Sequence, residues 1–131
     1  KTALEQVFFN ILKNAISYTK KGGEVSVSYA GQSNHVVMVS IEDYGVGIPQ
    51  KDLPHIFEPF YRSDKTGKLS GTGIGLAIVY EIIKLHKGTI EVDSTEGKGT
   101  SFMLSFPLHS APKTVAPRFP HLLRSFHISG K

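Results

Sequence analysis

Three glycines alternate with other residues at positions 71–75 and lead directly into an apolar segment, giving GTGIGLAIV over residues 71–79. Glycine lets a backbone approach an anion closely, and the free N–H groups and dipole of a helix N-terminus favour negative charge. The run therefore predicts a helix whose first turn binds a phosphate chain. Three glycines beside a helix also serve as ordinary turn residues, so the run alone does not decide between the two interpretations.

Hydrophobic periodicity predicts two helices and two hairpins. Apolar residues recur at the helical period over residues 4–19, residues 20–23 (KKGG) end this helix, and a second helix is expected over residues 73–87. Strands are expected at residues 24–30, 35–42, 89–94 and 100–106. These elements predict an α+β fold, a two-layer sandwich with helices on one face of a mixed, mainly antiparallel sheet.

The connection at residues 44–70 is rich in proline, glycine and charged residues. A connection of this length inside a compact domain is usually functional or mobile, so we interpret it as a lid. It contains Phe57 and Phe60. Because a loop rarely exposes two phenylalanines, we expect both to anchor the lid on the domain, with packing on a partner domain as a further role.

The formal charge of +4 comes entirely from the C-terminal end. Residues 1–107 contain eleven basic and eleven acidic side chains, whereas residues 108–131 contain four basic ones and no acidic one. We therefore expect no nucleic-acid partner for the folded part. The chain lacks cysteine, and no apolar run approaches the ~20 residues of a membrane span. We expect a cytoplasmic domain without direct membrane insertion, whether or not the parent protein is membrane-anchored.

Residues 108–131 form a separate basic segment that contains Pro112, Pro117 and Pro120 and follows no regular period. This composition favours a mobile tail. Its apolar residues leave a second interpretation open, in which a short amphipathic turn docks on an exposed edge of the sheet.

Four further stretches accompany the glycine run in a fixed order. They are the helix at residues 4–19, DYGVGIP at 43–49, IFEPFYR at 56–62 and GKGT at 97–100. Together the five stretches resemble the ATP-binding catalytic domain of sensor histidine kinases, in the superfamily shared with gyrase, MutL and the heat-shock chaperone ATPases. The resemblance covers residues 4–107 and implies ATP and magnesium as ligands. It also implies that residues 1–107 form a domain lacking the strand and short helix that generally precede the first helix in this family.

Asn10 and Asn14 lie one helical turn apart and can point into one cleft. An amide oxygen can complete the coordination shell of a magnesium ion already held by phosphates. By resemblance, Asn14 is the magnesium ligand and a catalytic residue, and Asn10 is a phosphate-side or supporting contact; the alternative is two solvated asparagines. The ATP-hydrolysing branches of the superfamily have a glutamate where this chain has Asn10, so activation of water is not expected here.

Asp43 ends an apolar strand and is followed by Gly45 and Gly47. A buried carboxylate needs hydrogen-bond donors, and the exocyclic amino group of adenine is one, so we interpret Asp43 as the group that selects adenine. The alternative is an ordinary Asx-turn.

The resemblance implies the remaining site residues. Tyr18 would lie against the adenine, Ile48, Ile74 and Leu76 would supply apolar contacts, and Arg62 would reach the terminal phosphate as a second catalytic residue. The full set expected to bind the nucleotide is Asn10, Asn14, Tyr18, Asp43, Gly45, Gly47, Ile48, Gly71, Thr72, Gly73, Ile74, Gly75, Leu76 and Thr100.

None of the six histidines is followed by an acidic residue, as the phosphoacceptor histidine of this family is. The resemblance therefore implies a chain that binds Mg-ATP and donates the γ-phosphoryl group to a histidine on a separate dimerisation domain of the same kinase. A receiver domain of a response regulator would act downstream. The alternatives are an ATP-hydrolysing module of the gyrase or MutL kind and a degenerate nucleotide-binding interaction module.

Overall fold

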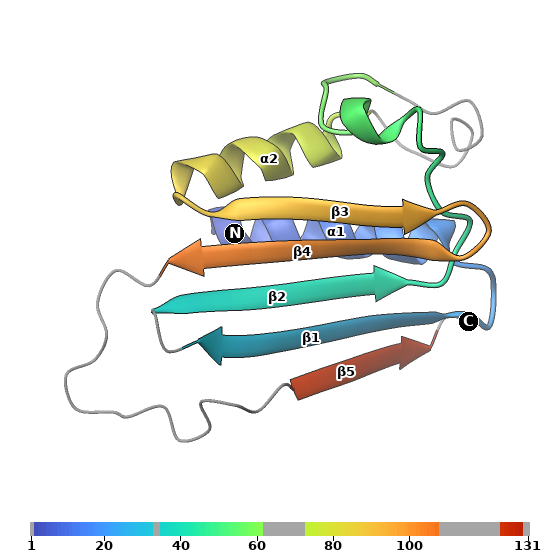
Figure 1. Ribbon diagram of the computed structural model, residues 1–131, viewed down its shortest axis with the longest axis horizontal. Coiled ribbons are helices and arrows are strands. Elements are labelled where there is room, and N and C mark those ends of the chain that lie inside the picture. Colours follow the sequence, from blue (N-terminus) through green and yellow to red (C-terminus); the bar gives the residue numbers. More distant parts are fainter. Residues whose placement is uncertain (1, 33–34, 62–72, 108–123, 130–131) are drawn as a thin grey trace.

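The computed structural model describes residues 2–32, 35–61, 73–107 and 124–129, which form a sheet covered on one face by helices (Figure 1). The helices are α1 (Ala3–Tyr18) and α2 (Gly75–Leu85), with a short 3-10 helix η1 (Leu53–His55). The strands are β1 (Glu24–Gln32), β2 (Val36–Asp43), β3 (Thr89–Thr95), β4 (Gly99–Pro107) and β5 (Arg124–Ser129). The predicted two-layer α+β fold is confirmed.

The sheet has the order β3-β4-β2-β1-β5, and each pair of neighbouring strands is antiparallel. The two predicted hairpins are present as β1–β2 and β3–β4. The central β2–β4 pair joins them, and its register places Asp43 opposite Thr100. The described strands therefore show no parallel pair of the kind that a mixed sheet would contain.

The core lies between the sheet and the two helices. In α1 the buried positions Val7, Ile11 and Ala15 are four residues apart, and α2 contributes Val79 and Ile83. Residues four apart share one face of a helix, which is why the apolar period predicted both helices. The sheet side of the core is formed by Val25, Ile41, Phe102 and Leu104.

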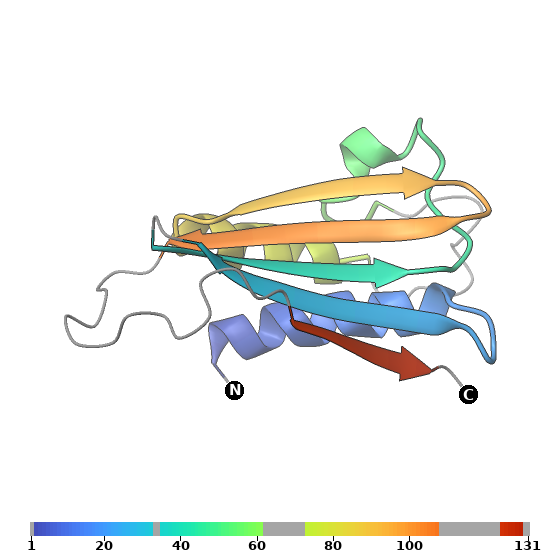
Figure 2. The same cartoon turned by 60° about the horizontal axis from the view of Figure 1, so that its bottom comes forward.

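The structure differs from the expected mobile tail at residues 124–129, which form β5 beside β1 (Figures 1 and 2). The register places Phe126 opposite Val27 and Ile128 opposite Val25. Six residues with an alternating apolar pattern can thus pair with a strand edge although the sixteen residues before them contain three prolines. This is the edge docking that the sequence left open, with a strand in place of a turn. Residues 108–123 lie outside the described residues.

Within the described part of the chain, no helix combines the length and the apolar character that crossing a membrane requires.

Candidate functional site

Asp43, the last residue of β2, is 6% exposed. Its Oδ1 accepts a hydrogen bond from the Gly45 N–H at 3.0 Å. This is the geometry of an Asx-turn, the alternative interpretation of Asp43. Burial raises the pKa of the Asp43 carboxyl above its ordinary value of 3.8, and hydrogen bonds from the backbone of Gly45 and Thr100 partly oppose this rise. A carboxylate offers about four acceptor positions. The turn and the recognition of a further donor are therefore compatible.

Gly45 and Gly47 allow the segment after β2 to lie against two other elements. A Cβ on Gly45 would lie 2.1 Å from the carbonyl oxygen of Tyr18, and one on Gly47, whose φ is +72°, would lie 2.2 Å from the carbonyl oxygen of Thr95. Both distances are far below van der Waals contact. The same approach is fixed by a hydrogen bond from the Val46 N–H to the Tyr18 carbonyl at 3.2 Å. These two glycines thus have a packing reason for their identity.

Ser94 supports this corner of the site, and the sequence analysis did not single it out. It is 3% exposed, and its Oγ accepts a hydrogen bond from the Ile48 N–H at 2.7 Å and donates one to the Gly99 carbonyl at 2.9 Å. The Thr100 hydroxyl lies 2.9 Å from the same oxygen. Ser94 therefore joins the segment after β2 to β4, beside Asp43. A serine in an alternating strand gives no local signal of such a role.

Asn10 connects α1 to the first residue of α2. Its Nδ2 donates to the Gly75 carbonyl at 3.2 Å, and its Oδ1 accepts from Gln6 Nε2 at 3.1 Å. Asn10 and Gly75 are 65 residues apart in the chain. Helix α1, with its two asparagines, and the glycine run are separate stretches of the sequence that are in contact in the structure. Gln6, which holds the Asn10 side chain, was not predicted as a site residue.

Asn14 lies one turn further along α1 and is half-buried. No hydrogen bond joins its amide to another residue of the described ranges. The described residues also contain no cluster of three His, Asp or Glu side chains able to hold a metal. A single neutral amide fits a magnesium ion that reaches the site on a triphosphate and has most of its ligands from phosphate and water.

The glycine run ends in a turn that is hydrogen-bonded to the described part of the lid. Gly73 has a φ of +76°, and its carbonyl accepts a hydrogen bond from the Phe60 N–H at 2.9 Å. Ile74 precedes the first residue of α2, Gly75, and no side chain caps this helix start. The side chains of Ile74 and Leu76 are half-buried, and Leu76 packs against the core.

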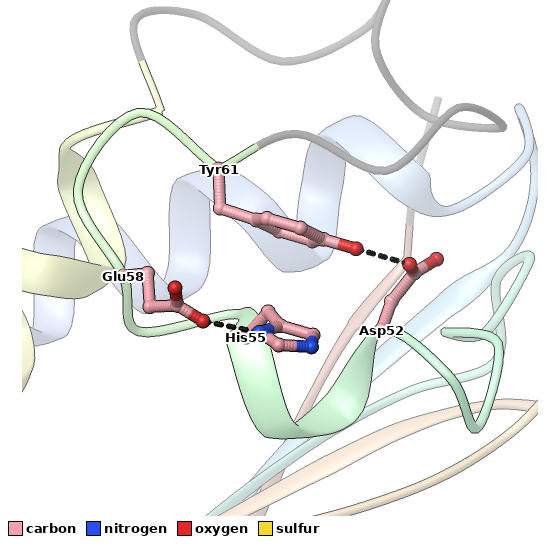
Figure 3. A network of polar contacts seen from close by, with 4 residues as sticks. All are labelled: Asp52, His55, Glu58 and Tyr61. Atoms are coloured by element: carbon pink, nitrogen blue, oxygen red, sulfur yellow. Dashed lines mark hydrogen bonds and ion pairs between the residues drawn. The ribbon is translucent and has the colours of Figure 1, made fainter.

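The described part of the lid, up to Tyr61, carries a polar network (Figure 3). Asp52, His55, Glu58 and Tyr61 are three residues apart, and each N–H donates to the carbonyl three residues earlier. The Tyr61 hydroxyl donates to the buried Asp52 carboxylate, His55 pairs with Glu58, and the His55 and Tyr61 rings stack. Local side-chain contacts therefore order this segment.

The two lid phenylalanines differ. Phe57 packs against the core, and the centroid of its ring lies 5.3 Å from the centroid of the Tyr80 ring on α2. Phe60 is 71% exposed and has a φ of +66°. The expectation that both rings anchor the lid therefore holds for Phe57, whereas Phe60 contributes an anchor through its backbone N–H.

The described site residues form two groups at different points of α1. Asp43, Gly45, Gly47, Ile48 and Thr100 gather near Tyr18, which is half-buried at the end of the helix. Gly73, Ile74, Gly75 and Leu76 gather near Asn10. Eight residues of helix separate Asn10 from Tyr18, a rise of about 12 Å. The expected residues Arg62, Gly71 and Thr72 lie outside the described residues.

A family model described as "Histidine kinase-, DNA gyrase B-, and HSP90-like ATPase" matches residues 1–110. The chain belongs to this family.

The curated relatives in this family include sensor histidine kinases. Sensor histidine kinase WalK of Bacillus subtilis is 44% identical over 107 residues, which is 79% of this chain and 18% of WalK. Sporulation kinase C of the same organism is 44% identical over 107 residues, which is 82% of this chain and 24% of the kinase. The chain thus spans about a quarter or less of the length of these relatives.

Solved structures agree with the fold. The mycobacterial sensor histidine kinase MprB is 31% identical with a TM-score of 0.74, over 80% of this chain and 72% of that chain. Full-length ShkA in complex with AMPPNP is 31% identical with a TM-score of 0.70, over 88% of this chain and 24% of that chain. The resemblance to the ATP-binding catalytic domain of sensor histidine kinases is confirmed.

Proposed function

We propose that this chain binds Mg-ATP and supports transfer of the γ-phosphoryl group to a histidine on a separate dimerisation domain of the same kinase. A receiver domain of a response regulator would then accept the phosphoryl group, and the reaction would take place in the cytoplasm. Residues 1–107 would form the catalytic domain. The observation that carries the proposal is the Asn10–Gly75 hydrogen bond, which places the asparagine face of α1 at the start of α2.

The base end of the nucleotide would lie at Asp43. Its buried carboxylate can accept a hydrogen bond from the amino group of adenine. Guanine presents a carbonyl at that position, and two acceptors cannot form a hydrogen bond with each other. Tyr18 and Ile48 would supply apolar contact, and Gly45, Gly47 and Thr100 would hold the backbone around the carboxylate.

The phosphate end would lie at the start of α2. Gly73 and Gly75 would offer backbone N–H groups there without a side chain in the way, and Gly71, Thr72 and Arg62 would add contacts to the phosphates. Asn14 would offer its amide oxygen to magnesium. When bound, the metal would neutralise charge on the triphosphate.

The chain's own residues favour transfer over hydrolysis. The Asn10 side chain is engaged by Gln6 and Gly75, and an amide does not take up a proton from water at neutral pH. The remaining contribution of the protein is to orient the γ-phosphoryl group for in-line attack. The nucleophile would come from the dimerisation domain.

The test is a phosphotransfer assay with labelled ATP and a histidine kinase dimerisation domain supplied in trans. We expect label on that domain, none on the six histidines of this chain, and slow release of phosphate. Asn14→Ala should abolish the transfer, whereas Ser17→Ala, an exposed change one turn along the same helix, should not. Rapid phosphate release without a protein acceptor would contradict the proposal.

A further inference from the structure

The outer edge of β1 is covered by a strand from the far end of the chain. β1 spans Glu24–Gln32, with β2 along one edge and β5 along the other, as the lower part of Figure 1 shows. β5 pairs with β1 from Glu24 to Tyr29. A strand edge presents a row of backbone N–H and C=O groups that pair readily with another extended segment.

The pairing register matches the apolar pattern of the two strands. Val25 is 1% exposed and belongs to the core, and Val27 packs against it. Ile128 and Phe126 occupy the positions opposite these valines. A shift by one residue would place polar positions there, so this edge selects a segment with apolar residues at alternate positions.

β5 is connected to the rest of the molecule mainly through this ladder. Among the described elements, it makes extensive contact with β1 alone. The connection 108–123 contains sixteen residues and can reach ~50 Å when extended. The end of β4 lies about 14 Å from the β5 position across the sheet, counted as three strand spacings. By its number of residues, the connection is therefore longer than this path requires.

We propose that the outer edge of β1 is a strand-addition site, which residues 124–129 occupy as a detachable strand. A separate peptide of the same pattern can replace that strand. The recognition consists of the backbone ladder and the alternating apolar positions, as in other cases where a peptide adds a strand to a sheet.

The ladder assigns the β1 amides to two sides. The Tyr44 N–H donates to the Glu24 carbonyl at 3.4 Å, so Glu24 faces the β2 side. Because facing alternates along an antiparallel strand, the N–H groups of Ser26 and Ser28 also face β2, and those of Val25, Val27 and Tyr29 face β5. By the same alternation the Phe126 N–H faces β1 and the His127 N–H faces away.

Amide hydrogen exchange of the unmodified chain tests this assignment directly. Val25, Val27 and Tyr29 should be protected, yet should exchange at least roughly tenfold faster than Ser26 and Ser28, because detachment of β5 leaves the β1–β2 pairing intact. Absence of protection at the first set would overturn the proposal, and so would equal rates in the two sets.

Replacement in trans uses two full-length variants and a synthetic peptide of residues 122–131. Phe126→Pro removes a ladder N–H and should abolish protection at Val25 and Val27, whereas His127→Pro should retain it. The peptide added to the Phe126→Pro chain should restore protection. Methylation of the peptide nitrogen at Phe126 should prevent this, and methylation at His127 should not.

Two outcomes of this second experiment would overturn the proposal. One is equal restoration by both methylated peptides, which would mean that the ladder does not direct binding. The other is loss of protection at Ser26 and Ser28 in the Phe126→Pro chain, which would mean that β5 is an integral part of the sheet.

Discussion

At the scale of single residues, Asp43 determines the expected choice of base. Replacing it by alanine removes a charged acceptor and should weaken ATP binding by about 1–3 kcal/mol. GTP binding, which lacks that hydrogen bond, should change much less. Calorimetric titration with both nucleotides measures the difference, with Asp93→Ala, an exposed aspartate on β3, as the control. Equal ATP affinity in the Asp43→Ala and unchanged chains would remove Asp43 from the site.

The raised pKa of Asp43 gives opposite pH dependences for stability and binding. A carboxyl whose pKa is raised by folding holds its proton more tightly in the folded chain, so its contribution to stability is complete below pH 3.8 and is lost as the pH rises through the folded value. ATP binding should change in the other sense, because protonation removes an acceptor for adenine.

Asp43→Asn provides the comparison for this pH dependence. Without nucleotide, the variant should gain stability relative to the unchanged chain as the pH rises above 3.8, and the two should converge in acid. Melting curves of both proteins between acid and neutral pH measure this difference. A difference that does not vary with pH would show that the Asp43 carboxyl does not titrate as its burial requires.

Asn10 and Asn14 form a matched pair on one helix. Asn10→Ala breaks the hydrogen bond to Gly75 and should lower the free energy of unfolding by about 0.5–1.5 kcal/mol in the absence of nucleotide. Asn14→Ala should leave that free energy nearly unchanged and weaken only the magnesium-dependent part of ATP binding. Urea unfolding and titrations with and without magnesium separate the two effects. Loss of stability in Asn14→Ala, together with loss of magnesium-dependent binding in Asn10→Ala, would contradict this assignment of roles.

At the scale of elements, the polar network of the lid should stabilise its described part. Tyr61→Phe removes the hydroxyl that donates to the buried Asp52 carboxylate and should lower the stability of this segment by about 1–3 kcal/mol. Limited proteolysis within residues 49–61 should become faster. His55→Ala removes the more exposed contacts with Glu58 and the Tyr61 ring and should have a smaller effect. A proteolysis rate in Tyr61→Phe equal to that of the unchanged chain would show that the Asp52–Tyr61 contact does not hold the segment.

Which elements could be predicted depended on how local their signals are. The helical period of Val7, Ile11 and Ala15 and the alternation in the two hairpins are read within a few residues, and these elements are present. β5 depends on pairing with a strand about a hundred residues earlier, so composition pointed to a mobile tail instead. The Ser94 and Gln6 contacts are likewise set by tertiary neighbours.

The same distinction applies to the site. Asp43, Asn10 and the glycine run were predicted as site residues because a family resemblance supplied what the spacing alone left open. The contact of Asn10 with the glycine run, through the hydrogen bond to Gly75, became visible only in three dimensions. The packing reason for Gly45 and Gly47 could not be read from the sequence, because it depends on the carbonyl groups of Tyr18 and Thr95.

At the scale of the whole molecule, ligand binding should appear as a shift of the folding equilibrium. Mg-ATP at a hundred times its dissociation constant should add about 2.7 kcal/mol to the free energy of unfolding and raise the melting temperature by several degrees. GTP at the same concentration should add much less. Thermal melts with each nucleotide measure the shifts, and equal shifts would point to binding through phosphates alone.

The hydrogen bond from the Phe60 N–H to the Gly73 carbonyl closes the backbone into a ring whose size is set by the residues between these two positions. With both ends fixed, extending a ring costs little, about 0.6 kcal/mol for each doubling of its length. The domain should therefore accept an inserted epitope or reporter sequence between residues 62 and 72 while the sheet and both helices keep their arrangement. This interval would be a natural place to build a sensor into the chain.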